Sequence, residues 1–415
     1  MIRKRHTPRH SRRLRRMAAA VCLLAVASGC ASPRPRPGDE LSRLGDEIVV
    51  CGRLFHTGTR VVLWTDPGGF DAYRVQRRFT NRDEIAPSRP ATGCDTPNRY
   101  TPLRAGLTDE VAARVQENGW TLDDLRTVVD QFVIHYDVCG SSRRCFEVLH
   151  DIRGLSVHFL LDVDGTIYQT LDLKERARHA GEANDRSIGI EIAHMGAYAD
   201  PSAPDQWYER DERGVRLRPV GSAVRTVDTH KTDDPGSVRS AQPTLQMNHH
   251  GTDGRRIFRP ARHEMIVGHI NGTRLHQYDF TPEQYDALAR LTATLVRVLP
   301  AIRLDIPRDH RSVQLPHDAV PRKQLFEPAR TLSMADLSVP GVPPVRPDAL
   351  SADELARYRG LLGHYHVTRQ KSDPGPAFDW ERLLGAVRAL MYDARGQFEV
   401  TKGTKRTETS VMWMR

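Results

Sequence analysis

A series of short apolar segments in the centre of the chain predicts the core of a β-sheet. Phe132–His135 has the length and composition of a buried strand. Val157–Leu161 and Thr166–Gln169 flank Asp164-Gly165, a dipeptide typical of two-residue hairpin turns. Ser187–Ala193 alternates isoleucines with small or acidic residues, as a strand with two different faces does. We therefore expect at least four strands here.

Helical patterns lie on both sides of this strand-rich centre. One begins at Thr108 and ends near Gly119. The segment Thr281–Gln284 is a capping box with proline at the first helical position, and an apolar helical face follows it down to Pro300. Asp379 is a suitable N-cap for a last helix. The expected fold class is α/β, with a central mixed β-sheet flanked by helices.

The first thirty residues predict export. Eight basic residues and no acidic residue precede the apolar stretch Met17–Ala27, which is too short for a permanent membrane span. The ending Ser28-Gly29-Cys30 resembles a bacterial lipoprotein cleavage box, so we expect Cys30 to be lipidated. An ordinary signal peptide cut near Ala31 is the alternative. With Cys30 lipidated, the protein would face the periplasm, anchored to the outer membrane if the cell is Gram-negative.

The charge of the chain does not predict a nucleic-acid partner. The formal net charge is +9, but eight positive charges belong to the leader, so the mature chain is close to neutral. No basic tract is interleaved with aromatic residues, as nucleic-acid-binding surfaces usually are.

The cysteines of the mature chain predict two disulfides. Cys51, Cys94, Cys139 and Cys145 remain once the leader is removed and Cys30 is lipidated. An even number in an exported chain favours disulfides, and no CxxC spacing points to metal binding by thiolates. A Cys139–Cys145 bond would close a tight loop, and a Cys51–Cys94 bond would hold the N-terminal region.

The chain is long enough for two or three domains, and composition divides it further. Two polar or proline-rich stretches with little periodicity predict insertions in loops. The expected organisation is a signal peptide at 1–29, a lipidated cysteine and proline-rich tether at 30–46, a small β-rich region at 47–105, a main region at 106–400 with insertions at about 195–262 and 305–350, and a tail at 401–415.

A cluster of polar residues near the C-terminus predicts a metal site. His364 and Asp373 lie nine positions apart, and Lys371 lies between them, in an irregular segment rich in proline and glycine. Because catalytic zinc usually takes three protein ligands, a third is needed, and His135 at the end of a predicted strand is the best candidate. His269 also follows an apolar run and a glycine, but no Lys-x-Asp-Pro follows it. These residues suggest a zinc hydrolase.

Other polar residues near the predicted strands are weaker candidates. Glu191 lies in the apolar strand 187–193, where a carboxylate costs free energy unless it is used; a buried ion pair is the alternative reading. His158 and His179 flank the hairpin region and could be core residues or substrate contacts.

Five segments, taken in order, resemble the zinc-dependent N-acetylmuramoyl-L-alanine amidases of the type-2 amidase and peptidoglycan recognition protein superfamily. The resemblance covers roughly half of the chain. The segments are Phe132–His135, Ser156–Gln169, Arg178–Gly181, Asn184–Glu191 and Gly363–Trp380. The spacing of Cys139 and Cys145 also resembles a disulfide of the recognition proteins.

The resemblance implies a role for each candidate. His135, His364 and Asp373 would bind Zn²⁺, Glu191 would act as general base, and Lys371 would stabilise the oxyanion. His158, His179 and Asn184 would contact a peptidoglycan or muropeptide substrate, cut between N-acetylmuramic acid and L-alanine. Val157 and Arg178 depart from residues frequent in the superfamily. A non-catalytic peptidoglycan-binding module and an amidase restricted to anhydro-muropeptides are the alternatives.

Overall fold

The computed structural model describes residues 37–38, 43–74, 99–218, 257–309, 332–333 and 342–392. Residues from Gly45 onward group into one compact unit, separate from Met1–Leu44. The predicted leader, the lipidated Cys30, Cys94, the 401–415 tail and parts of both predicted insertions lie outside the described residues. Within the described part, no helix is long and apolar enough to cross a membrane.

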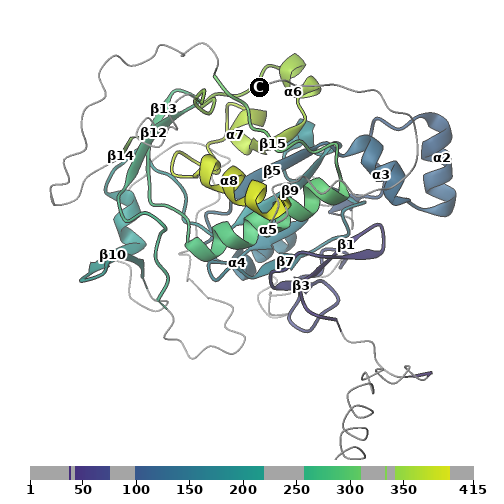
Figure 1. The fold of residues 1–415 in the computed structure, drawn as a ribbon, viewed down its shortest axis with the longest axis horizontal. Helices are drawn as coiled ribbons and strands as arrows, with labels where there is room; N and C mark the ends of the chain where they lie inside the picture. Colours follow the sequence, from purple (N-terminus) through teal and green to yellow (C-terminus); the bar gives the residue numbers. More distant parts are fainter. Residues whose placement is uncertain are drawn as a thin grey trace, which may run out of the picture. The chain divides into compact units, whose positions relative to one another are not determined.

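The compact unit is built on a six-stranded mixed sheet with the order β15-β5-β9-β6-β7-β3 (Figure 1). The first four strands run parallel, β6 and β7 are antiparallel, and β3 is parallel to β7. The predicted mixed sheet and its hairpin around Asp164-Gly165 are therefore confirmed. The strands are β3 (Val61–Leu63), β5 (Gln131–Tyr136), β6 (Phe159–Leu161), β7 (Ile167–Gln169), β9 (Ser187–Ile192) and β15 (Gly360–Gly363).

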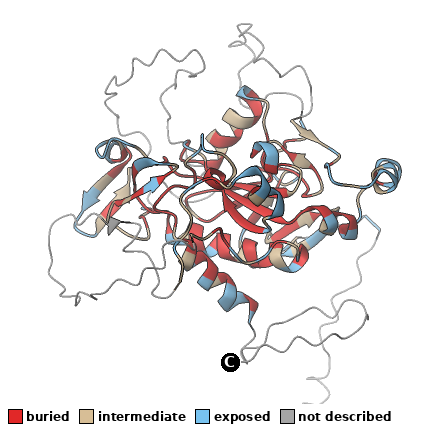
Figure 2. Ribbon diagram, turned by 90° about the horizontal axis from the view of Figure 1, so that it is seen from above, coloured by how far each residue is buried: buried red, intermediate tan, exposed pale blue. Residues whose placement is uncertain are grey.

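The two faces of the sheet differ in chemistry, because side chains alternate along each strand. Ile188, Ile190 and Ile192 of β9 join Phe132 and Ile134 of β5 in the main hydrophobic core. The opposite face of the same strands carries the polar candidates. Figure 2 shows the buried sheet between more exposed helices and loops.

Two long helices cover the apolar face and lie side by side (Figure 1). In α5 (Pro282–Val298) the capping box of Thr281 and Gln284 forms as predicted. In α8 (Trp380–Met391) Asp379 is the N-cap, also as predicted. The remaining helices are α2 (Asp109–Asn118), α3 (Leu122–Val128), α4 (Ser142–Phe146), η2 (Glu147–Ile152), η3 (Gly181–Ala183), η4 (Ala203–Gln206), α6 (Ala352–Arg357) and α7 (His364–Val367).

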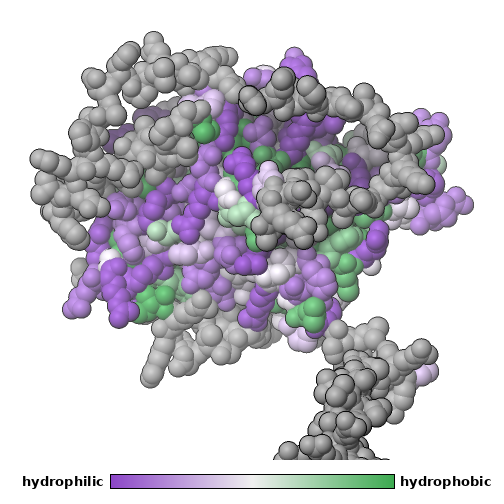
Figure 3. All heavy atoms as spheres, viewed as in Figure 1, coloured by the Kyte–Doolittle hydropathy of each residue, from purple (hydrophilic) through white to green (hydrophobic). Residues whose placement is uncertain are grey.

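Smaller sheets surround the central one. The predicted β-rich N-terminal region contributes a hairpin, but its third strand is β3, so this region shares the central sheet. Hydrophilic side chains dominate the described surface in Figure 3. The other strands are β1 (Glu47–Val50), β2 (Arg53–His56), β4 (Tyr100–Thr101), β8 (Arg176–Ala177), β10 (Tyr208–Asp211), β11 (Gly214–Leu217), β12 (Ile266–Ile270), β13 (Thr273–Gln277) and β14 (Leu332–Ser333).

Two segments expected to be irregular contain regular structure. The loop expected at 363–376 begins with the short helix α7. This helix follows directly after β15, and the N–H of its C-cap residue, Thr368, donates to the carbonyl of His364. The insertion expected at 195–262 contains the antiparallel hairpin β10–β11.

Candidate functional site

Neighbouring parallel strands bring the candidate residues to one end of the sheet. In the register of β5 and β9, His135 pairs with Glu191. Ile134 pairs with Gly363, the last residue of β15, and His364 follows at once as the first residue of α7. This end carries the carboxyl termini of parallel strands, where open α/β sheets commonly bind ligands.

His135, His364 and Asp373 form a tight triad. Nδ1 of His135 lies 3.0 Å from Nδ1 of His364 and 2.8 Å from Oδ2 of Asp373. Nδ1 of His364 lies 3.0 Å from the same carboxylate oxygen. All three side chains are buried, and their donor atoms all lie within 4.8 Å of one another. His135 thus meets two residues that lie more than 200 positions away in the sequence.

The ionisation of the triad suits a metal ion. Burial, followed by the neighbouring His364, lowers the pKa of His135 to about 4. Burial alone would raise the pKa of Asp373, but the two histidines hold it well below its ordinary value. At neutral pH the imidazole of His135 is therefore neutral and the carboxylate ionised, the states that bind metals. Two imidazole nitrogens and one carboxylate are a donor set that fits zinc, with a fourth position left for water.

His179 contacts the second ring nitrogen of His135, the one that does not face His364 and Asp373. Its Nδ1 lies 3.0 Å from Nε2 of His135, and its Nε2 lies 3.3 Å from Oγ of Ser187. Contacts of this kind fix the orientation of a metal-binding histidine. Gly189 leaves room for the ring, because a Cβ there would lie 2.5 Å from Nδ1 of His179.

Glu191 is half-buried beside the triad, and one of its carboxylate oxygens is fully buried. Its Oε2 has no hydrogen-bond partner among the described residues. Burial, then the charge of Asp373, raises the pKa of Glu191 well above its ordinary value, whereas Lys371 works in the opposite direction. A divalent cation at the triad would also favour the ionised form. The partner that a buried structural ion pair would need is not found among the described residues.

One pocket of about 290 Å³ is lined by His364, Asp373, His179, Glu191 and Lys371. His135 contacts two of these residues, His364 and Asp373. Lys371 is exposed to solvent, and its charge acts on both His135 and Glu191. The other walls combine apolar and basic side chains, so the pocket can contact a substrate with both apolar and anionic parts. They include Val138, Val148, Leu149, Leu155, Arg153 and Arg178.

Two of the three predicted substrate contacts, His158 and Asn184, form hydrogen bonds inside the protein. Nδ1 of His158 accepts the N–H of Gly189, and its Nε2 donates to the carbonyl of Glu175, so the ring is neutral and fully buried. The amide oxygen of Asn184 accepts the N–H groups of His179 and of the next residue. Neither side chain lines the pocket. Each of these two side chains hydrogen-bonds inside the protein, and the substrate contact expected of each stays a prediction.

His269, the competitor for the metal site, lies elsewhere. It is exposed on β12, where it pairs with Arg274 of β13, and it does not line the pocket. The structure therefore groups His364, and not His269, with His135.

Cys139 and Cys145 are buried in the pocket wall as free thiols. Burial, then a hydrogen bond with Cys139, raises the pKa of Cys145 well above its ordinary value. Cys51 is also a free thiol, and its expected partner Cys94 lies outside the described residues. The two disulfides remain predictions.

Sequence reasoning missed two polar residues of the pocket that directly follow His135. The hydroxyl of Tyr136 lies 2.7 Å from Oγ of Ser372, the residue that precedes Asp373. Oδ1 of Asp137 accepts three backbone N–H groups, which hold the turn at the pocket wall. Their position directly after His135, at the end of a predicted strand, is the sequence feature that could have identified them.

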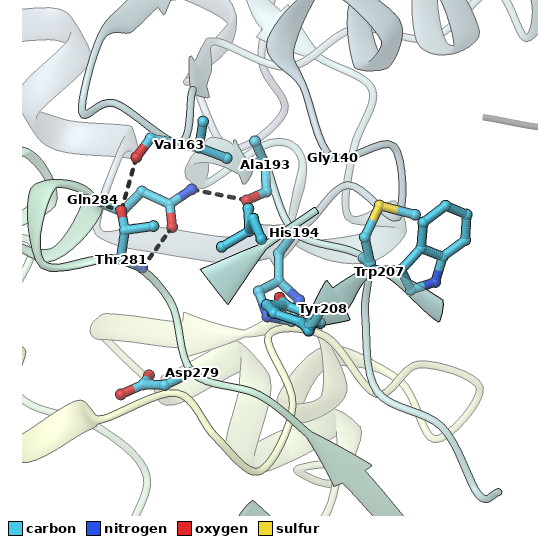
Figure 4. Close-up of a pocket in the computed structure, with 11 residues that line it drawn as sticks. Gly140, Val163, Ala193, His194, Trp207, Tyr208, Asp279, Thr281 and Gln284 are labelled. Atoms are coloured by element: carbon cyan, nitrogen blue, oxygen red, sulfur yellow. Dashed lines mark hydrogen bonds between the residues drawn. The ribbon is translucent and has the colours of Figure 1, made fainter. Parts of the chain in front are cut away.

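A second pocket, drawn in Figure 4, is an interior packing space and not a binding site. Its volume is about 10 Å³, room for no more than a water molecule. Gln284 donates to the carbonyl of Ala193 and Thr281 donates to that of Val163, which joins the start of α5 to the sheet. The nearby His194 donates to the carbonyl of Tyr278.

Comparison with known proteins finds one family similar to part of the chain. Residues 125–237 match the family model described as N-acetylmuramoyl-L-alanine amidase. The matched segment contains His135, His179 and Glu191 and ends before His364 and Asp373. The matched segment is thus similar to N-acetylmuramoyl-L-alanine amidases, in line with the resemblance that the sequence shows.

Three solved structures are similar to parts of the chain. A selenomethionine derivative of AmpD is 16% identical over 63% of this chain and 86% of that chain, with a TM-score of 0.25. The Escherichia coli amidase AmiD, in complex with anhydro-N-acetylmuramic acid-L-Ala-D-gamma-Glu-L-Lys, is 28% identical over 17% of this chain and 33% of its own, with a TM-score of 0.16. The endolysin amidase LysCS from Clostridium intestinale is 27% identical over 16% of this chain and 47% of its own, with a TM-score of 0.15. No curated protein matches the chain.

Proposed function

We propose that this protein is a zinc-dependent N-acetylmuramoyl-L-alanine amidase, which hydrolyses the amide bond between N-acetylmuramic acid and L-alanine in peptidoglycan or muropeptides. The observation that carries the proposal is the buried triad of His135, His364 and Asp373, with Glu191 and Lys371 in the same pocket. Amide hydrolysis needs a polarised carbonyl, an activated water and a proton for the leaving amine, and this pocket holds groups for each.

Each residue has one task in this reaction. The triad would hold zinc, which when bound polarises the carbonyl and makes its water acidic. Glu191 accepts a proton from the attacking water and returns it to the leaving nitrogen of L-alanine. The Lys371 ammonium complements the negative charge that develops on the carbonyl oxygen. His179 keeps the ring of His135 in its ligating orientation.

We further propose that the protein acts outside the cytoplasm, tethered by a lipid on Cys30. The basic and apolar leader and the Ser28-Gly29-Cys30 ending support this location. A lipid-anchored amidase would meet its substrate in the cell wall next to the membrane that holds it.

The test is product analysis with the purified protein. Muropeptides that end in ordinary or in anhydro-muramic acid are incubated with the protein, with and without a chelator. The products are identified by mass spectrometry. We expect a free muramic acid moiety and a peptide that begins with L-alanine, lost with chelator and restored by Zn²⁺. Cleavage at another bond, or cleavage that survives metal removal, contradicts the proposal. Binding without cleavage supports a recognition module, and the two sugar forms reveal any restriction to anhydro-muropeptides.

A further inference from the structure

One hairpin outside the central sheet holds the segment that carries two of the three triad residues. β12 and β13 are joined by the two-residue turn Asn271-Gly272, and both turn residues have positive φ (48° and 81°). Such turns favour asparagine followed by glycine, because both positions are left-handed. The hairpin lies beside α7 and the loop that follows it (Figure 1).

The tip of the hairpin binds the backbone on the N-terminal side of Asp373. Nδ2 of Asn271 lies 3.3 Å from the carbonyl oxygens of Tyr365 and Thr368, and 2.9 Å from that of Lys371. Two amide hydrogens serve three acceptors, so at least one hydrogen is shared. Oδ1 of Asn271 accepts the N–H of Ala349 at 2.8 Å, which fixes the orientation of the amide.

The base of the hairpin binds the backbone on the C-terminal side of Asp373. Gln277 is fully buried; its Nε2 donates to the carbonyl of Pro374 at 3.0 Å, and its Oε1 accepts the N–H of Ala377 at 2.9 Å. Gly375 permits this approach, since a Cβ at that position would collide with Oε1 of Gln277.

We infer that the β12–β13 hairpin is a clamp that sets the position of Lys371 and Asp373 at the metal centre, with Asn271 and Gln277 as its positioning residues. This inference rests on the proposed function. Lys371 is exposed and its side chain is long, so the carbonyl bond from Asn271 limits where the ammonium can reach. Gln277 holds the residues that directly follow Asp373. Neither amide touches the substrate pocket or the triad.

The test uses side-chain replacements that keep the local backbone. Asn271→Gly keeps the left-handed turn but removes the amide. Gln277→Glu keeps an acceptor for Ala377 and removes the donor to Pro374. Thr273→Ala, at an exposed position of the same hairpin, is the matched control.

Three quantities are measured on the full chain: hydrogen exchange of the amides in 364–377, the Zn²⁺ dissociation constant by competition with a chelating dye, and kcat and KM on a muropeptide. For Asn271→Gly and Gln277→Glu we expect exchange to be faster and zinc binding to be weaker by about 10-fold or more, the usual effect of residues that support metal ligands. For Asn271→Gly we expect kcat to fall by about 10-fold with KM changed less than about twofold, because Lys371 acts in the transition state.

The inference is overturned if both variants match Thr273→Ala in exchange and in zinc affinity. If one variant fails to fold, the exchange and zinc affinity of the other still test the inference, since the two side chains act on opposite sides of Asp373. Exchange in the metal-free protein needs neither zinc nor activity. A wild-type chain that binds no zinc or cleaves no muropeptide would therefore refute the proposed function while leaving the clamp testable.

Discussion

At the scale of single residues, burial and close neighbours set the ionisation of the site. His135 stays neutral because burial lowers its pKa, and Asp373 stays ionised because two histidines surround it. Glu191 has a buried oxygen without a partner among the described residues, an arrangement that costs stability. A protein retains such a group where its chemistry is used, which makes Glu191 the most informative side chain to change.

Glu191→Gln should keep the fold and the metal but remove the base. The replacement preserves size and polarity, so we expect stoichiometric zinc and a normal melting temperature. Hydrolysis of a muropeptide should fall by about 10²-fold or more, the usual contribution of a positioned general base. Near-normal kcat in this variant would refute the assignment. Zinc content and kcat are the two measurements.

His364→Ala should abolish zinc binding, because it removes one of three donors that converge within 3.0 Å. His269→Ala is the control, since His269 follows a similar apolar run but is exposed on β12. We expect bound zinc, measured by elemental analysis after dialysis, to be lost in the first variant and kept in the second. The reverse result would move the metal site.

At the scale of elements, α2 and α3 are joined by one carboxylate. Asp124 completes the capping box of α3 with Thr121 and also accepts a hydrogen bond from Arg114 of α2. The Arg114 guanidinium, more than any other group, lowers the pKa of Asp124 to about 2. Because this pKa lies below the value of about 3.9 in an unfolded chain, ionised Asp124 stabilises the fold above that pH.

Asp124→Asn should destabilise the protein by about 1 kcal/mol at pH 7, through the weakened cap and the lost charge. The difference from wild type should shrink as pH falls from about 4 to about 2, where wild-type Asp124 takes up a proton. Asp123→Asn is the control, since this neighbour is largely exposed in its ion pair with Arg126. The free energy of unfolding of the wild type and of both variants is measured with urea at several pH values. An equal difference between Asp124→Asn and wild type at pH 7 and at pH 2 would contradict this role of Asp124.

At the scale of the whole molecule, buried neutral histidines make stability depend on pH. Burial lowers the pKa of His194 to about 4 and, with Arg104, that of His158 to about 3. The unfolded chain binds these protons near pH 6.5. Stability is therefore complete above about pH 6.5 and declines as the pH falls toward the folded-state values.

His194→Asn should make this decline less steep. One proton fewer is taken up on unfolding between about pH 6.5 and pH 4, so the slope should fall by about 1.4 kcal/mol per pH unit in that range. The free energy of unfolding is measured with urea at half-unit pH steps. An unchanged slope would show that His194 is not held neutral in the folded protein.

Cys30→Ala should release the protein from the membrane fraction, because the lipid attachment site is lost. Cys22→Ala is the control, because this residue lies in the predicted leader, which we expect to be removed on processing. The measurement is fractionation of cells followed by immunoblotting. Membrane association that survives in Cys30→Ala would contradict the lipoprotein prediction.

Much of the fold could be predicted from local pattern. Capping residues such as Thr281 and Asp379 mark helix starts through contacts three residues away, and Asp164-Gly165 marks a hairpin turn. α7 was missed because four residues carry too little periodicity to be recognised. The strand β3 has an ordinary strand pattern, but its pairing with β7 links residues about a hundred positions apart.

The sequence by itself determined the chemistry of this protein: which residues can bind a metal, where the strands and helices begin, and which strand carries an acid in an apolar setting. Only the tertiary structure decided which of these groups meet. His135 faces Glu191 because β5 and β9 pair in one register, and a shift of one residue would send Glu191 to the opposite face. The Asn271-Gly272 dipeptide is itself a turn signal. The contacts that Asn271 and Gln277 make left no signal in the sequence, because a single amide does not show which backbone it will bind. Their partners lie about a hundred positions away, and only packing brings them within hydrogen-bond distance.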